Sequence, residues 1–146
     1  MASVRQKARI VALQALYEAD MAHHSAKESV ERLLLESRLS AHGQVAAREL
    51  VCGVVEHQQE VDQVLQKTAP QWPLNQVAAV DRNILRLAIY EILFNNRERS
   101  MPRGIVINEA VDLAKSFGSE KSPGFVNGVL GHLTREHTGT AEHLLT

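Results

Sequence analysis

Residues 77–94 read VAAVDRNILRLAIYEILF, and their aliphatic side chains would surround a helix on nearly every side. A helix of this kind is either buried in a protein core or crosses a membrane. Charged residues interrupt the stretch, which falls short of the roughly 18 continuous apolar residues that a membrane span needs. We therefore predict a buried central helix over residues 76–96.

Shorter patterns with a helical period precede the central helix. They predict helices over residues 3–22 and 27–39, the second of them capped by Ser25. A third helix runs through Val54, and a further helical segment is predicted at 61–65. The stretch 40–43 is expected to break the second helix before the third begins.

Prolines and glycines mark the remaining boundaries. The stretch 69–73, APQWP, is expected to end helical structure, because each proline disfavours helix in the residue before it. Pro102 and Gly118 stand where a further helix would begin and end. Ser122 and Pro123 would open the last helix as its N-cap and its first-turn residue.

The composition favours packed helices. The 146 residues are 45% hydrophobic but only 4% aromatic, so the core must be aliphatic. We predict an all-α fold of about seven helices, in one domain over residues 1–146 with two packed sub-bundles. The first sub-bundle is expected over about 3–58 and the second over about 59–137, and the tail at 138–146 is expected to fray.

The residues that could support catalysis form no known motif. Seven histidines include no His-Glu-x-x-His pair, and His23 and His24 would point about 100° apart on a helix. Cys52 is the only cysteine and lies among aliphatic residues, as is typical of a small core residue. A phosphate-binding glycine loop and a nucleophile motif are both missing. The sequence predicts no enzyme, no cofactor and no metal site.

The charge balance limits the ways in which the chain could bind nucleic acid. The formal net charge is −1, so a polyanion would have to be held by a local basic patch. A secretory signal and a membrane span are not predicted, and a single cysteine fits a reducing compartment. We expect a cytoplasmic protein that does not bind membranes.

Two stretches could form such a patch. Arg5, Lys7 and Arg9 open the first helix, where Arg5 and Arg9 are four residues apart and would project together toward phosphates. The alternative is an ordinary solvated helix end. The connector 115–125 combines lysines and hydroxyls with Phe125 at a helix N-terminus, where a phosphate could bind and an exposed ring could stack on a base. The alternative is a plain loop with Phe125 in the core.

Acidic residues occur on the otherwise apolar central helix. Asp81 would favour the helix dipole near its start. Glu91 would either pair internally, with an arginine such as Arg82 or Arg86, or face a protein partner.

Several segments resemble the NusB family in order and spacing. They cover nearly the whole chain apart from residues 23–45 and the tail, and the last two are the most specific. The segments are 8–9, 12–17, 80–91, 107–118 and 125–130.

The resemblance implies an all-α fold of two helical bundles and a non-enzymatic role in transcription antitermination. It implies binding to the boxA element of ribosomal-RNA transcripts, as a heterodimer with NusE, the small-subunit ribosomal protein, with other antitermination factors and RNA polymerase contacted indirectly. The candidate RNA-binding residues are Arg5, Lys7, Arg9, Lys115, Ser119, Lys121, Ser122 and Phe125. The candidate NusE-binding residues are Asp81, Arg82 and Glu91.

Other hypotheses remain beside this one. The chain could be an interaction module that binds only NusE and leaves RNA contact to it. Some RNA methyltransferases carry a NusB-like domain at their N-terminus, but that hypothesis needs a further domain with a cofactor motif, which these 146 residues do not contain. Some family members self-associate, which leaves a homodimer open, although no exposed heptad seam requires one.

Overall fold

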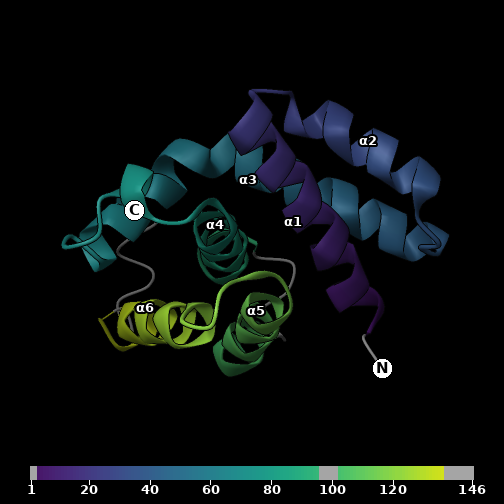
Figure 1. Ribbon diagram of the computed structural model, residues 1–146. Helices are drawn as coiled ribbons and strands as arrows, with labels where there is room; N and C mark the ends of the chain where they lie inside the picture. Colours follow the sequence, from purple (N-terminus) through teal and green to yellow (C-terminus); the bar gives the residue numbers. More distant parts are fainter. Residues whose placement is uncertain (1–2, 96–101, 137–146) are drawn as a thin grey trace. The chain divides into compact units, whose positions relative to one another are not determined.

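The structure is a computed structural model that describes residues 3–95 and 102–136 (Figure 1). In this part of the chain all regular structure is helical, which confirms the all-α prediction. The α-helices are α1 (Val4–Ala22), α2 (Ala26–Glu36), α3 (Ala41–Thr68), α4 (Ala79–Leu93), α5 (Arg103–Phe117) and α6 (Ser122–Glu136), with a short 3-10 turn η1 (Leu74–Gln76).

Serine side chains start the first two helices. The Ser3 hydroxyl accepts a hydrogen bond from the amide N–H of Gln6, and the Ser25 hydroxyl accepts one from the amide N–H of Glu28. The predicted cap at Ser25 is therefore confirmed. Helix α2 ends at Glu36, before the predicted residue 39, because Ser37 is extended and its amide N–H turns back to the carbonyl of Leu34.

Helix α3 is longer than predicted, and it begins at Ala41, within the stretch 40–43 that was expected to be a break. The sequence suggested a third helix and a separate segment near Val61, but Ala41–Thr68 is a single helix of 28 residues. The two patterns are separated by the polar run EHQQE at 56–60, which interrupts the apolar face without interrupting the backbone. Polar residues of this kind are compatible with a helix interior, whereas proline is not.

Helix α4 is the buried central helix that the sequence predicts. Ten of its 15 residues are buried. It starts at Ala79 rather than at residue 76, because Leu74–Gln76 form η1 instead. It ends at Leu93, before the predicted residue 96, which itself lies outside the described residues.

Pro102 and Gly118 flank α5 as predicted. Helix α6 begins at Ser122, and the carbonyl of Lys121 accepts a hydrogen bond from the amide N–H of Phe125. The helix thus starts one residue earlier than an N-cap at Ser122 would give.

The chain divides into two compact units, Met1–Gln58 and Gln59–Thr146. In the first, α1 packs against α2 (Figure 1). In the second, α4, α5 and α6 pack against one another. The predicted tail at 138–146 lies outside the described residues.

The core is aliphatic, as predicted from the composition. Among residues 3–95 and 102–136, the buried hydrophobic side chains are all alanine, valine, leucine or isoleucine. None of the helices in these ranges combines the length and the apolar character needed to cross a bilayer.

Candidate nucleic-acid interface

The first basic candidates lie in the first two turns of α1. Its first turn contains no acidic residue. Lys7 is exposed and Arg5 is half-buried. This end of α1 therefore offers Lys7, and in part Arg5, to a polyanion.

Arg9 lies on the packed face of α1, and the expectation that it would project into solvent with Arg5 is wrong. Only 2% of Arg9 is exposed. At about 100° per residue, Arg9 shares a face with Ala12 and Leu13, which are also buried. Lys7 is about 160° away around the helix. The expectation considered charge and spacing but not the apolar face on which Arg9 falls.

A tight turn joins α5 to α6. The Ser122 hydroxyl accepts a hydrogen bond from the amide N–H of Ser119 at 2.9 Å, and the two hydroxyl oxygens are 3.2 Å apart. A Cβ on Gly118 would lie 2.4 Å from the Ser122 Oγ, so glycine is required by this close approach. Ser122 is buried. It was expected to face RNA, but its hydroxyl instead closes the turn.

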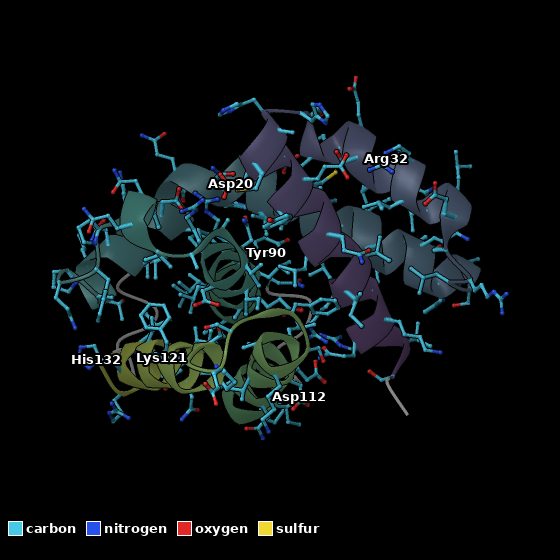
Figure 2. All side chains as sticks on the ribbon, viewed as in Figure 1. Asp20, Arg32, Tyr90, Asp112, Lys121 and His132 are labelled. Atoms are coloured by element: carbon cyan, nitrogen blue, oxygen red, sulfur yellow. The ribbon has the colours of Figure 1, made fainter. Side chains whose placement is uncertain are left out.

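The other candidates of this turn are accessible. Lys115, Ser119 and Lys121 are exposed, and Phe125 is half-buried. Lys121 immediately precedes α6 (Figure 2), and Phe125 follows one helical turn later. Lys121, the Ser119 hydroxyl and the Phe125 ring thus lie at the start of α6, beside the exposed Glu120, whereas Lys115 lies in the last turn of α5. Backbone N–H groups at a helix N-terminus favour an anion.

The ring of Phe125 contacts that of Trp72. Their centroids are 5.8 Å apart and their planes are inclined by 78°, which is an edge-to-face arrangement. The sequence did not decide whether Phe125 is buried in the core or exposed. In the structure its ring is half-buried and packs against Trp72. Sequence reasoning treated Trp72 only as part of the proline-rich boundary, since no periodic pattern links it to α6.

Asp81 lies in the first turn of α4, where the helix dipole favours a carboxylate. Only 8% of it is exposed, and its Oδ1 has no hydrogen-bond partner in the part of the chain that the structure describes. Burial of a carboxylate oxygen without a hydrogen-bond donor destabilises the folded state. Glu91, the second acidic candidate, is equally buried.

Arg82 and Arg86 bind within the second unit. The Arg82 guanidinium donates hydrogen bonds to the carbonyls of Leu74 and Val77, at 3.1 and 2.8 Å. Arg86 donates to both carboxylate oxygens of Asp62, at 2.8 and 3.0 Å. Arg82 therefore supports the η1 turn, and Arg86 pairs with Asp62 of α3.

The described ranges contain no candidate metal site. Within residues 3–95 and 102–136, no three histidine, cysteine, aspartate or glutamate side chains are placed to hold an ion. Cys52 is half-buried in α3.

The model of the NusB family matches residues 6–135. This span includes all the candidate residues described above except Arg5. The chain belongs to the NusB family.

Individual NusB proteins match over nearly their whole length. The transcription antitermination protein NusB of Roseiflexus sp. (strain RS-1) is 47% identical over 131 residues, which are 90% of this chain and 92% of that protein. Its counterpart in Chloroflexus aggregans (strain MD-66 / DSM 9485) is 42% identical over 142 residues, 97% of this chain and 94% of that protein.

Solved structures of NusB share the fold. T. maritima NusB has a TM-score of 0.84 and 33% identity, covering 94% of each chain. A crystal structure of the antitermination factors NusB and NusE in complex with dsRNA matches with a TM-score of 0.82 and 30% identity, covering 93% of this chain and 99% of that one. The NusB-like architecture predicted from the sequence is thereby confirmed.

Proposed function

We propose that this NusB-family chain acts in transcription antitermination by binding boxA-type single-stranded RNA of ribosomal-RNA transcripts together with NusE. The names of its relatives and the crystallised NusB–NusE complex with dsRNA support this proposal. The proposed activity is binding without catalysis, in the cytoplasm.

The turn before α6 carries the proposal. Exposed Lys115 and Lys121 supply positive charge, and Ser119 supplies a hydroxyl donor. Such groups bind phosphates without reading the bases. The ring of Phe125 is partly accessible and offers a surface on which an unpaired base can stack, and unpaired bases are the usual targets of sequence-selective RNA binding.

The start of α1 is proposed as a second phosphate contact. Lys7 and Arg5 are the residues concerned, since the burial of Arg9 removes its guanidinium from the solvent. If the two stretches together neutralise three to five phosphates, log K should fall with log salt at a slope of about −2 to −3.5.

The NusE contact is proposed at the start of α4. Asp81 supports it, because a donor from a partner protein would satisfy a carboxylate oxygen that finds no donor in the described part of this chain. Arg82 is assigned instead to the support of η1, since its guanidinium already donates to two carbonyls.

A titration separates this function from that of a module that binds only NusE. Fluorescently labelled boxA RNA and a scrambled RNA of the same composition are titrated with the isolated chain at low salt, and then with NusE added. The proposal predicts tighter binding of boxA RNA by the isolated chain and a further gain with NusE. A module that binds only NusE would show no preference for boxA until NusE is present.

Double-stranded RNA provides the matching control, because a related complex contains dsRNA. The same boxA RNA annealed to its complement hides the base faces that Phe125 would contact. The proposal predicts weaker binding of the duplex. Equal affinity for both forms would assign the chain to backbone recognition of double-stranded RNA instead.

A further inference from the structure

Trp72 is half-exposed although it is the only tryptophan of the chain and lies in a short, well-anchored loop. Its exposed fraction is 52%. The loop follows α3 and has a proline on each side of Gln71 and Trp72. About half of the residue is thus accessible to a ligand, although the other half is covered.

The loop is held by its own hydrogen bonds. The amide N–H of Trp72 donates to the carbonyl of Ala69 at 3.0 Å. The side chain of Gln66 donates to the carbonyl of Trp72 at 3.4 Å and accepts from the amide N–H of Leu74 at 3.0 Å. The backbone that carries the indole is therefore fixed on both sides, and the ring is presented by a preorganised loop.

The contact with Phe125 involves only part of the indole surface. In an edge-to-face pair one ring gives its edge and the other gives one face. The remaining faces are not covered by the pair itself. Within the described residues, the indole N–H of Trp72 has no hydrogen-bond acceptor either.

Charge next to the pair indicates an anionic ligand. Lys121 is exposed and precedes Phe125 by four residues, one helical turn. A half-exposed indole, a phenyl ring in contact with it and a neighbouring ammonium group combine a stacking surface with a phosphate contact. This combination is typical of single-stranded nucleic-acid binding.

We propose that Trp72 and Phe125 together form a stacking platform for an unpaired base of the bound RNA, which extends the RNA surface to the loop after α3. This inference rests on the proposed function and adds a residue that the RNA surface did not include. Lys121 would hold the phosphate next to the stacked base.

The single tryptophan provides a direct measurement. Its fluorescence, excited where tyrosine does not absorb, is followed during titration with single-stranded boxA RNA in the presence of NusE. The Trp72→Phe variant keeps a ring and removes the indole signal, so it serves as the blank for any fluorescence of NusE. A stacked base should quench the Trp72 signal with the same Kd that anisotropy of labelled RNA gives.

Variants give the second readout. Trp72→Ala should weaken RNA binding about 5- to 150-fold, the range expected for loss of one base–aromatic stack. Trp72→Phe should restore most of the affinity. The matched control is Leu35→Ala, which removes another exposed apolar side chain, on α2, and should leave the Kd unchanged. Circular dichroism melting checks that each variant is folded.

The contrary outcomes are distinct. If wild-type fluorescence is not quenched and Trp72→Ala keeps the wild-type Kd while Lys121→Gln weakens binding, the platform is refuted and the proposed function stands. If Trp72→Ala loses affinity for NusE but not for RNA, the ring belongs to a protein interface and the inference is again refuted. If the wild-type protein does not prefer boxA RNA at all, the proposed function fails and the platform fails with it.

Discussion

Arg86 shows how a charge is accommodated beside an aliphatic core. Its side chain is 8% exposed and the Asp62 side chain 21%. The guanidinium forms two parallel hydrogen bonds with the carboxylate of Asp62, and it also donates to the Asn83 side-chain oxygen at 3.2 Å. The bidentate geometry satisfies both ions, and it joins α3 to α4 within the second unit.

Removing one partner of this pair should be costly. Arg86→Ala is expected to lower the free energy of unfolding by about 3–5 kcal/mol, because the Asp62 carboxylate would remain partly buried without its partner. Urea denaturation followed by circular dichroism measures the change. Arg38→Ala, at an exposed position between α2 and α3, is the control and should change the value by less than about 0.5 kcal/mol.

Lys121 permits a prediction on the RNA side. Lys121→Gln should make the slope of log K against log salt shallower by about 0.7, because one phosphate contact to a single strand is lost. Lys27→Gln, on α2, is the matched control and should leave the slope unchanged. An identical slope for Lys121→Gln and wild type would remove Lys121 from the RNA surface.

Single residues were predicted from the sequence with uneven success. The cap at Ser25 and the helix boundaries at Pro102 and Gly118 follow from local backbone chemistry, and they were predicted correctly. The burial of Arg9 could have been predicted from its place on the apolar face of α1. The buried hydroxyl of Ser122 could not, because it depends on the close approach of Gly118 across the turn.

At the level of elements, two glycines near α6 illustrate opposite requirements. Gly128 lies within α6 at an exposed position, and a Cβ there would meet nothing within 4 Å. Gly118 precedes the helix, and a Cβ there would collide with Ser122. The same substitution should therefore have opposite effects on stability.

The pair is tested by one alanine substitution at each position. Gly128→Ala should raise the free energy of unfolding by about 0.5–1 kcal/mol, because alanine has the higher helix propensity. Gly118→Ala should lower it by about 1–3 kcal/mol, because the turn must open. Chemical denaturation measures the free energy of unfolding of both variants. Changes of the same sign in the two variants would contradict the geometry of the turn.

The length of α3 shows the limit of periodicity as a guide to elements. The polar run at 56–60 removes the apolar repeat on which a helix prediction depends, so the sequence suggested two pieces. The backbone has no reason to break there, because the run contains neither proline nor glycine. A helix end should therefore have been predicted only where a proline or glycine provides a stop signal, and residues 56–60 contain neither.

At the level of the whole molecule, ion pairs between helices of the first unit make its stability dependent on pH. Hydrogen bonding from Arg48 holds the pKa of Glu31 below its usual value, and hydrogen bonding from Arg32 does the same for the pKa of Glu18. Arg48 joins α3 to α2 through this pair, at 2.7 Å between its Nε and the Glu31 Oε2.

The sign of the pH effect follows from these directions. A carboxyl whose pKa is lowered by folding contributes its stabilisation above the pKa of the unfolded chain, and loses it as the pH falls through the lower pKa of the folded state. The melting temperature should therefore fall in acid, below the usual range of glutamate. This acid-induced drop in melting temperature should be smaller in the Glu31→Gln variant than in wild type, when the melting of both is measured from neutral pH to acid. An equal drop in both proteins would mean that the Glu31–Arg48 pair does not contribute to the pH dependence.

The contact between Trp72 and Phe125 depends on tertiary packing and could not be predicted from the sequence. The two residues are far apart along the chain, and only the packing within the second unit brings their rings together. The fold class and the aliphatic core, in contrast, follow from composition and helical period. The RNA site was predicted as two basic stretches, and the structure adds which of their side chains reach solvent.

RNA selectivity in the presence of NusE, measured for wild type and for the double variant Lys121→Gln/Phe125→Ala, is the most direct test of the RNA site at the start of α6. Anisotropy titrations give the ratio of Kd for scrambled RNA to Kd for boxA RNA. We predict a ratio well above one for wild type and a ratio near one for the double variant, with its fold intact by circular dichroism. A folded double variant that keeps the wild-type ratio would contradict the assignment of the RNA site to the start of α6.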